Sequence, residues 1–487
     1  MNKRPNILIF MTDHQRGDTI FKENGTIMPN LNKLMENGIT FSECFCPTPH
    51  CCPSRATFFT GLYPSQHGIW NNVHNGMALA KNLKQGVRLF SEELKDAGYR
   101  LSYAGKWHVS YDEDPAHKGF EELFVSAKSG NNHATTWEAI ERNAQTARQD
   151  WEKGREEGKI LRKGYTTDVL YGRADEGSRH DDTSVAQTAN KIREYAKDPD
   201  TPWCAMVGTS MPHAPYWVPQ KYLDMYPIET IDLPESYYDT LEDKPNYYRK
   251  LRQMRFAQLT ELEYKQAIRH FRAMCTYLDD LFGQLMDALR ETGQLDNTLV
   301  LFTSDHGDYL GEHGLFHKGV PAFRGAYHIP GVISWPAGIK NPDRVISELV
   351  SLADFAPTFL EAAGIKTDNE MVGQSLMPFL EDRNPDTWRD AIFTQCNGVE
   401  NYFTQRSVIT KEYRYTYNGF DFDELYDLRV DPNEMTNKIH EPSYETTIKE
   451  LCKKMWQFAR QTDDQLPTSG NYITIATAAY GPGVVFN

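Results

Sequence analysis

The chain has 487 residues and a formal net charge of −15, from 52 Lys and Arg against 67 Asp and Glu. This length exceeds one ordinary domain, so we expect a large α/β domain with a smaller partner. The acidic balance argues against non-specific binding to nucleic acid or to an anionic membrane, because both need a basic surface. An anionic substrate would require positive charge concentrated at one site.

The N-terminal segment predicts a buried strand that runs into a polar loop. Residues 6–11 are Asn-Ile-Leu-Ile-Phe-Met, and Thr12, Asp13 and His14 follow. Because α/β sheets bind ligands at the carboxyl ends of their strands, Asp13 is well sited for a metal, and helix capping is an equally good interpretation. The apolar run is too short for a signal peptide, and no later run approaches a membrane span, so we expect a cytoplasmic protein with no membrane partner.

The segment 51–61 predicts a short helix with a thiol at its start. Pro53 suits the first turn of a helix, and Gly61 ends it about two turns later. Cys51 would then lie at the positive end of the helix, which lowers a thiol pKa and favours a bound anion. A buried structural cysteine is the alternative. The polar loop that follows could contribute Asn71 to a pocket.

Cysteine spacing argues against two other kinds of site. Eight cysteines without regular spacing do not indicate a disulfide framework. Four of them lie close together, but neither pair has the spacing of zinc ligands: Cys44, Cys46, Cys51 and Cys52.

Two further predicted strands end near basic residues. Residues 100–104 predict a strand whose exit carries Lys106 and His108 on one side. The strand expected at 203–207 leads into a loop in which His213 lies between two prolines. A surface lysine and structural histidines would be the ordinary explanation of these three residues.

The strand expected at 297–302 leads through Thr303 and Ser304 to Asp305 and His306. Together with Asp13, these residues supply two carboxylates and a histidine from distant segments, a ligand set suited to Ca²⁺, Mg²⁺ or Mn²⁺. Without a cation between them the two carboxylates would repel each other. Lys318 follows in a glycine-containing polar segment.

Several of these segments resemble the signatures of the type I sulfatases, the formylglycine-dependent branch of the alkaline phosphatase-like superfamily. The Cys-x-Pro-x-Arg pattern from Cys51 to Arg55 is similar to their first signature, and Gly-Tyr-x5-Gly-Lys-x-His, ending at His108, is similar to their second. The segments around His213 and over 305–319 resemble theirs as well. The fold implied is a large mixed β-sheet flanked by helices, with a smaller C-terminal α+β subdomain.

We expect a catalytic domain over residues 1–385 and a C-terminal subdomain and tail over 386–487. The polar, charged stretch at about 120–199 predicts solvated helices and loops inserted in the first domain, the expected source of substrate selectivity. Five aromatic or basic residues could contact a substrate: Trp137, Arg148, Arg173, Arg324 and Arg406.

The resemblance implies that a maturase converts Cys51 to formylglycine and that the enzyme hydrolyses a sulfate ester of a saccharide or small organic molecule. It implies one divalent metal, Ca²⁺ before Mg²⁺ or Mn²⁺. The implied metal ligands are the modified Cys51 with Asp13, His14, Asp305 and His306. The implied catalytic residues are Cys51, Arg55, Lys106, His108, His213 and Lys318, and the implied substrate contacts are Asn71, Lys106, His213 and Lys318.

The sequence leaves the role of His14, the substrate type and the oligomeric state undecided. Sulfatases often have Asp-Asp or Asp-Gln where this chain has Asp13-His14, which leaves the role of His14 as a ligand undecided. Asp305-His306 also occurs in related phosphonate monoester and phosphodiester hydrolases, the nearest alternative function. A non-enzymatic protein that binds a metal or keeps a reduced thiol is the second alternative, and a homo-oligomer is compatible with the sequence.

Overall fold

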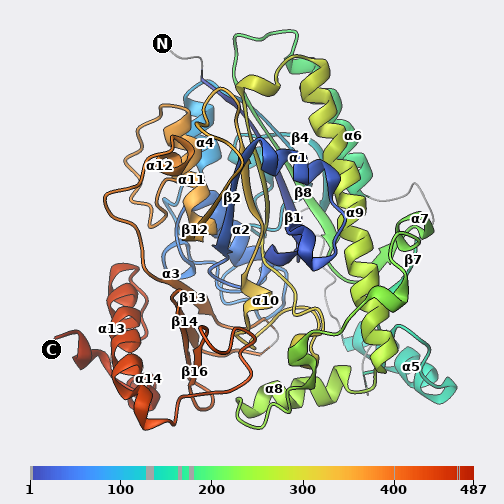
Figure 1. Cartoon of the computed structure of the whole chain (residues 1–487), viewed down its shortest axis with the longest axis vertical. Helices are drawn as coiled ribbons and strands as arrows, with labels where there is room; N and C mark the ends of the chain where they lie inside the picture. Colours follow the sequence, from blue (N-terminus) through green and yellow to red (C-terminus); the bar gives the residue numbers. More distant parts are fainter. Residues whose placement is uncertain are drawn as a thin grey trace.

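The computed structural model describes residues 4–127, 137–162, 167–174, 180–399, 401–468, 470 and 472–486. A large central sheet lies between two layers of helices, and a smaller sheet with its own helix lies beside it, nearer the C-terminus (Figure 1). The predicted fold class is therefore confirmed.

The large sheet has eight strands in the order β12 (Arg344–Ser351), β2 (Gly38–Phe45), β11 (Gly331–Ser334), β10 (Thr298–Ser304), β1 (Asn6–Asp13), β8 (Trp203–Pro212), β3 (Arg100–Lys106) and β4 (Glu121–Ala127). Within it, β11 runs antiparallel to both neighbours, and the other pairs are parallel. Residues 7–13 of β1 are all buried, as the apolar run predicted, because helices cover both faces.

Two groups of helices cover the sheet. One contains α1 (Pro29–Glu36), α6 (His180–Tyr195) and α9 (Glu261–Glu291), and the other contains α2 (Cys51–Thr60), α4 (Phe90–Asp96) and α11 (Phe355–Ala362). The long helical pattern over 260–292 is one continuous helix, and Thr260 caps its start by accepting a hydrogen bond from the backbone N–H of Glu263. Shorter helices are α3 (Pro64–His67), α7 (Gln220–Leu223), α8 (Asn246–Leu251), α10 (Arg324–Tyr327) and α12 (Met377–Leu380).

The smaller sheet is antiparallel, in the order β13 (Ile392–Cys396), β14 (Gln405–Ile409), β15 (Tyr413–Asn418) and β16 (Glu424–Asp427). Helix α13 (Glu445–Gln461) packs on it and closes a separate core that contains Val408, Tyr415 and Trp456. After α14 (Tyr472–Thr477), the chain returns to α13, where the Trp456 indole N–H donates to the Tyr480 carbonyl at 2.8 Å.

The structure differs from the expected polar insertion at both of its ends. Strand β4 is an edge strand of the large sheet, and α6 packs against β3, β4 and β8. The buried side of α6 includes small polar residues such as Ser184 and Thr188, whose hydroxyls donate to helix carbonyls at 2.8 Å. Small polar residues can be buried when their hydroxyls are hydrogen-bonded within the helix. The composition of α6 therefore predicted a solvated helix, whereas one side of it is buried in the structure.

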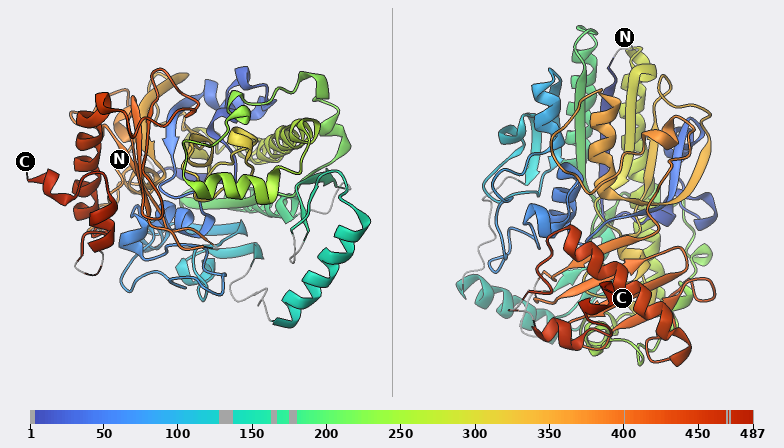
Figure 2. Two further views of the ribbon diagram at one scale, coloured as in Figure 1. Left: turned by 90° about the horizontal axis from the view of Figure 1, so that it is seen from below. Right: turned by 90° about the vertical axis from the view of Figure 1, so that its left-hand side faces the viewer.

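Between β4 and α6, helix α5 (Trp137–Lys153) is mostly exposed and projects from the body of the molecule (Figure 2). The short strands β5 (Lys159–Ile160) and β6 (Asp168–Val169) pair with each other. Strand β7 (Tyr171–Arg173) pairs with β9 (Tyr216–Val218). This segment therefore reaches the loop that follows β8.

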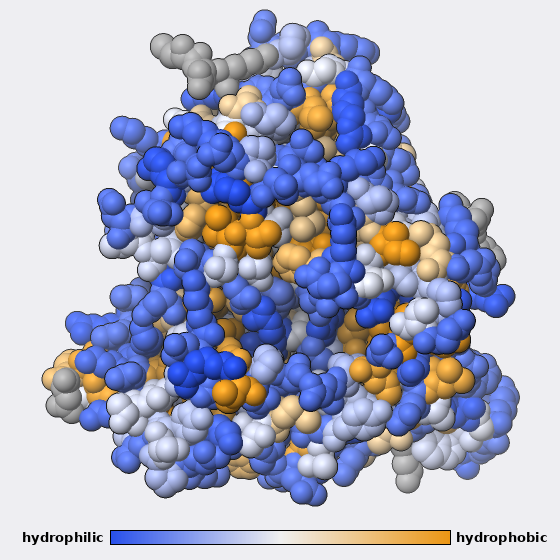
Figure 3. Space-filling model, in the orientation of Figure 1, coloured by the Kyte–Doolittle hydropathy of each residue, from blue (hydrophilic) through white to orange (hydrophobic). Residues whose placement is uncertain are grey.

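Hydrophilic residues cover most of the face drawn in Figure 3, and hydrophobic residues form separate groups between them. Among the described helices, none combines the length and the apolarity that a membrane crossing requires. All eight cysteines are buried and unbridged, in agreement with their irregular spacing.

Candidate functional site

The predicted site residues gather at the carboxyl edge of the large sheet. Parallel strands β1, β3 and β10 end at or just before Asp13, Lys106 and Asp305. Strand β8 ends one residue before His213. Because these strands are neighbours that point the same way, residues about 300 positions apart meet at one place.

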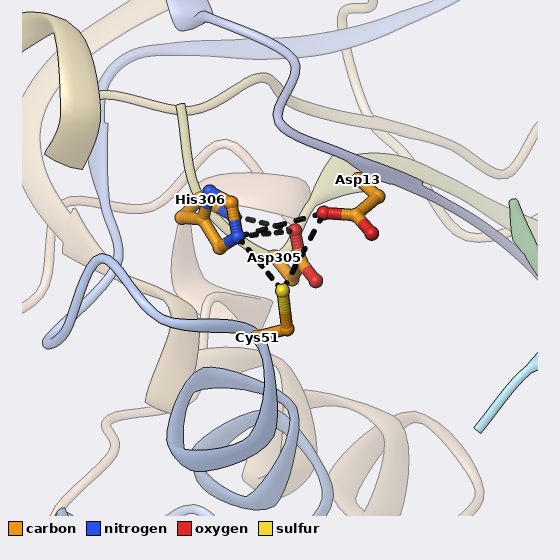
Figure 4. A group of neighbouring side chains, drawn as sticks. All are labelled: Asp13, Cys51, Asp305 and His306. Atoms are coloured by element: carbon orange, nitrogen blue, oxygen red, sulfur yellow. Dashed lines mark hydrogen bonds and ion pairs between the residues drawn. The ribbon is translucent and has the colours of Figure 1, made fainter. Parts of the chain in front are cut away.

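Four buried side chains point toward one another at this edge: Asp13, Cys51, Asp305 and His306 (Figure 4). Their ligand atoms all lie within 4.8 Å of one another. The Cys51 Sγ is 3.3 Å from His306 Nε2 and 3.7 Å from Asp13 Oδ1. One cation could contact an atom from each of the four residues.

The hydrogen bonds of His306 fit a metal ligand. Its Nδ1 lies 2.9 Å from the Gly307 carbonyl, which can only accept, so Nδ1 carries the proton and Nε2 presents a lone pair. That nitrogen faces Asp13 Oδ1 at 3.5 Å and Asp305 Oδ1 at 3.6 Å. Three electron-rich atoms therefore converge, an arrangement that a divalent cation would stabilise.

The carboxylates of this cluster have opposite pKa shifts. Burial raises the pKa of Asp13, but Lys106 and other nearby cations outweigh it and hold the pKa well below its ordinary value. Burial and the Asp13 charge both raise the pKa of Asp305. A cation between the two would favour the ionised form of both.

Cys51 occupies the first residue of α2, as the sequence predicts. The helix ends at Gly61, which is left-handed at φ 67° and whose N–H donates to the Thr57 carbonyl at 2.9 Å. Burial and Asp13 act to raise the pKa of Cys51, yet Lys106 and nearby cations hold it well below the ordinary thiol value. Burial instead raises the pKa of the adjacent Cys52, so the two neighbouring thiols differ in reactivity.

Arg55, one turn along α2, is fully buried beneath the cluster. Its Nε donates to Asp305 Oδ2 at 2.8 Å, and its Nη1 donates to the Lys106 carbonyl at 2.7 Å. Its Nη2 is buried and has no hydrogen-bond partner among the described residues. Arg55 thus holds the Asp305 carboxylate and the Lys106 carbonyl in place.

Lys106 and His108 lie on the same strand exit but have different surroundings. The Lys106 ammonium pairs with the Asp13 carboxylate. The ring of His108 stacks on that of His74, with centroids 4.8 Å apart. Burial and then Lys106 lower the pKa of His108 well below its ordinary value, so this imidazole is neutral.

His14 has partners other than the four-residue cluster. Its Nδ1 is 2.9 Å from Asp308 Oδ2, which also accepts from the Tyr216 hydroxyl at 2.7 Å, and its Nε2 accepts from the Lys318 ammonium. Lys318 also lies 3.2 Å from Cys51 Sγ. His14 therefore links a buried carboxylate to Lys318. Asp308 was not predicted, although its position three residues after Asp305 was a signal.

His213 lies beside His14, with the two imidazole centroids 4.1 Å apart, and ligand atoms of Asp13, His14 and His213 lie within 4.8 Å of one another. Its Nδ1 lies 2.6 Å from the Ala214 carbonyl, so Nδ1 holds the proton and Nε2 is an acceptor. Burial and then Lys318 lower the pKa of His213 to about 4. The ring is thus neutral at physiological pH.

Asn71 is buried and accepts a hydrogen bond from the Leu79 N–H at 3.1 Å. Its neighbour Asn72 accepts from the Cys52 N–H and lines a solvent-accessible cavity next to the site. None of the five substrate contacts suggested by composition lines that cavity. Three of them pair elsewhere: Arg148 with Glu152, Arg324 with Glu43 and Arg406 with Asp464.

A cavity of about 640 Å³ opens above the cluster. His14, His213 and Lys318 are the predicted site residues that line it. Its walls also contain residues that the sequence did not indicate, among them Arg162, Asp168, Trp217, Tyr247, Arg255 and Phe403. They come from segments without a motif and meet only through tertiary packing.

Comparison with known proteins identifies the family. The Sulfatase family model matches residues 5–365, and the model for the C-terminal part of N-sulphoglucosamine sulphohydrolase matches residues 311–461. The chain is 29% identical over 448 residues to the uncharacterized sulfatase YidJ of Escherichia coli K12, and the match covers 90% of this chain and 83% of that protein.

A second relative is the N-acetylglucosamine-6-O-sulfatase of Bacteroides thetaiotaomicron, which is 25% identical, with 96% of this chain and 88% of that protein covered. The crystal structure of the phosphonate monoester hydrolase of Agrobacterium radiobacter has the same fold, with a TM-score of 0.75, 24% identity, and coverage of 94% and 96%. The chain, with its α/β sheet and the matching family model over most of its length, therefore belongs to the sulfatase family and is a sulfuric ester hydrolase.

Proposed function

We propose that this sulfatase hydrolyses sulfate esters of small saccharides, with a formylglycine made from Cys51 by a maturase and with one divalent metal ion. The observation that carries the proposal is the position of Cys51, with its Sγ 3.3 Å from His306 Nε2 and 3.7 Å from Asp13 Oδ1, below a cavity that reaches solvent. An aldehyde hydrate at this residue would present oxygen atoms to the same ligand set.

Asp13, Asp305 and His306 would hold the metal together with residue 51. Carboxylate oxygens favour Ca²⁺, with Mg²⁺ and Mn²⁺ as alternatives. When bound, such an ion supplies Lewis-acid stabilisation of negative charge on the ester. His14 is better suited to hold Lys318 than to bind the ion, because Asp308 and Lys318 occupy both of its ring nitrogens.

The remaining residues supply positive charge or transfer protons. Arg55 and Lys106 provide fixed positive charge next to residue 51, where an anionic ester must bind. We assign the base to His108 from its place in the second signature; its imidazole is neutral, and its lowered pKa makes it a weak base in the absence of substrate. His213 presents an acceptor nitrogen, so the Lys318 ammonium is the better donor to a departing alcohol.

The size and walls of the cavity support a saccharide. Trp217, Tyr247 and Phe403 line it, and their rings suit the apolar face of a sugar. One relative is named an N-acetylglucosamine-6-O-sulfatase, which points to the same substrate class.

Peptide mass spectrometry and sulfate release test the proposal together. In protein produced with a competent maturase, the peptide containing Cys51 should lose roughly 18 Da. Cys51→Ala should abolish sulfate release, whereas Cys52→Ala, the matched control at the next residue, should retain it. An unmodified Cys51 in active enzyme would contradict the formylglycine route.

The nearest alternative is a phosphonate monoester or phosphodiester hydrolase, for which the similar fold of the Agrobacterium radiobacter enzyme is the support. Rates measured side by side on a sulfate monoester and a phosphonate monoester separate the two. A clear preference for the phosphonate would overturn the proposed substrate. The non-enzymatic alternative has no support once the chain belongs to an enzyme family.

A further inference from the structure

Before any conversion, the four-residue cluster contains a sulfur donor. The Cys51 Sγ lies 3.3 Å from His306 Nε2 and 3.7 Å from Asp13 Oδ1. His306 Nε2 lies 3.5 Å from Asp13 Oδ1 and 3.6 Å from Asp305 Oδ1. Zinc bonds of about 2.0–2.3 Å at tetrahedral angles separate neighbouring ligand atoms by about 3.3–3.7 Å. The cluster therefore has the dimensions of a four-coordinate zinc site.

The two carboxylates each turn one oxygen atom toward this cluster. The other oxygen of Asp13, Oδ2, pairs with the Lys106 ammonium. The Oδ2 of Asp305 accepts from Arg55 Nε at 2.8 Å. With one ligand atom from each of its residues, the cluster has the coordination number of a closed zinc site, whereas Ca²⁺ takes about six to eight oxygen ligands.

The types of donor atom also favour zinc. A thiolate and an imidazole are softer ligands that select zinc, and calcium prefers oxygen atoms alone. The His306 Nδ1–H donates to the Gly307 carbonyl at 2.9 Å, which holds the ring with Nε2 toward the cluster. The charges of Arg55, Lys106 and Lys318 repel Zn²⁺ and Ca²⁺ to the same extent, so they leave the choice of metal to the ligands.

The neighbouring cysteine shows the surroundings of a structural thiol in this fold. Cys52 belongs to the hydrophobic core, and its Sγ accepts from the Val73 N–H at 3.4 Å. The Cys51 Sγ instead lies among a carboxylate, an imidazole and the Lys318 ammonium, which is 3.2 Å away. Packing as a small apolar residue does not explain a sulfur in these surroundings. A metal-bound thiolate can still accept a hydrogen bond, so Lys318 can keep its place.

We propose that the chain with an unconverted Cys51 binds one Zn²⁺ ion at this cluster, and that conversion to formylglycine turns the preference of the site from zinc toward calcium. The zinc ligands are Asp13, Cys51, Asp305 and His306. The zinc site needs only the chain as it is synthesised. The change of preference rests on the proposed function, because it requires the sulfur atom to be replaced by oxygen.

Metal titration of the full-length protein, produced without the maturase, tests the zinc site. Peptide mass spectrometry first establishes that Cys51 is unconverted. Zinc should bind, and X-ray absorption at the zinc edge should show one sulfur ligand at about 2.3 Å. Competition with a chelating dye gives the dissociation constants for Zn²⁺ and Ca²⁺, and their ratio is the zinc preference.

Two variants assign the sulfur ligand. Cys51→Ser nearly keeps the size of the side chain and replaces sulfur by oxygen. It should lower the zinc preference by about 100-fold or more, because loss of a residue that only supports a ligand already costs about 10–100-fold in metal affinity. Cys52→Ala, the matched control, removes the neighbouring thiol and should keep both the preference and the sulfur ligand.

Fully converted protein supplies a comparison that needs no substitution. Zinc added to it should have only oxygen and nitrogen ligands, and its zinc preference should fall to that of Cys51→Ser. A converted protein that keeps the preference of the unconverted chain would overturn the proposed change.

The zinc site is refuted if X-ray absorption finds no sulfur ligand in the unconverted wild type, or if Cys51→Ser keeps the zinc preference. Sulfate release by converted, calcium-loaded protein reports separately on the proposed function. A zinc site in the unconverted chain without sulfate release after conversion would overturn the activity and retain the site. Sulfate release without a zinc site would overturn the site and retain the activity.

Discussion

Replacing Arg55 by methionine is the most direct test of the electrostatics beneath the site. The guanidinium is fully buried and pairs with Asp305 Oδ2 at 2.8 Å, and Asp305 is fully buried too. Removing one partner of a buried ion pair costs about 3–5 kcal/mol, because the other charge is left without compensation. We therefore expect a large loss of stability in protein stripped of metal.

The expected shift in melting temperature follows from the size of the chain. At about 2.1 cal/mol/K per residue, the unfolding entropy of 487 residues is on the order of 1 kcal/mol/K, so Tm should fall by about 3–5 °C. Differential scanning calorimetry with EDTA measures this. Arg148→Met removes an exposed i,i+4 pair with Glu152 and should leave Tm unchanged.

The Tm difference between wild type and Arg55→Met should depend on pH, and the pKa of Asp305 determines the direction. Burial and Asp13 raise the pKa of Asp305, so its protonated form is favoured in the folded protein at low pH, and that stabilisation is lost as pH rises through the raised pKa. A protonated Asp305 does not need Arg55. The gap in Tm between wild type and Arg55→Met should therefore narrow as pH falls.

Addition of Ca²⁺ should also reduce the Tm difference between wild type and Arg55→Met, because the ion would compensate the charge of Asp305 in place of the arginine. The double variant Arg55→Met with Asp305→Asn should recover part of the loss, since no uncompensated charge remains. Equal Tm values for Arg55→Met and Arg148→Met at neutral pH would refute the reasoning.

Three further predictions concern the site and its support. His14→Asn should lower kcat by about 10–100-fold, because Lys318 loses the partner that orients it, while elemental analysis finds the same metal content; loss of the metal instead would make His14 a ligand. Chelation should abolish sulfate release, and Ca²⁺, Mg²⁺ or Mn²⁺ should restore it; full activity in protein shown to be metal-free would contradict the metal site. Burial lowers the pKa of His67 to about 3, and its Nδ1 accepts from the Ile69 N–H, so wild-type stability should fall as pH drops from about 6.5 toward 3. Urea unfolding of His67→Gln should show a shallower acid slope, and an unchanged slope would assign the acid sensitivity to other groups.

Local sequence signals were sufficient to predict much of the frame. The apolar run of β1, the proline and glycine that bound α2, and the long helical pattern of α9 all correspond to observed elements. These signals depend on neighbours within a few residues along the chain. For the same reason the strand exits that carry Asp13 and Asp305 were predictable.

Other elements depended on contacts that no local pattern records. Strand β12 has exposed positions in its first half and was not predicted, yet it pairs with β2. Helix α6 is buried through paired polar residues and resembled a solvated helix. In both cases the partner surface decides burial, and that surface comes from a distant part of the chain.

By itself the sequence determined which residue types could do the chemistry: a thiol at a helix start, and acids and bases at strand ends. Only the tertiary structure decided how they are paired. It set His14 between Asp308 and Lys318, which contact both of its ring nitrogens although its ring lies 4.4 Å from that of His306, and it brought Arg162 and Arg255 together on Asp168. Charge pairing depends on distances of a few ångströms between side chains, and packing sets those distances.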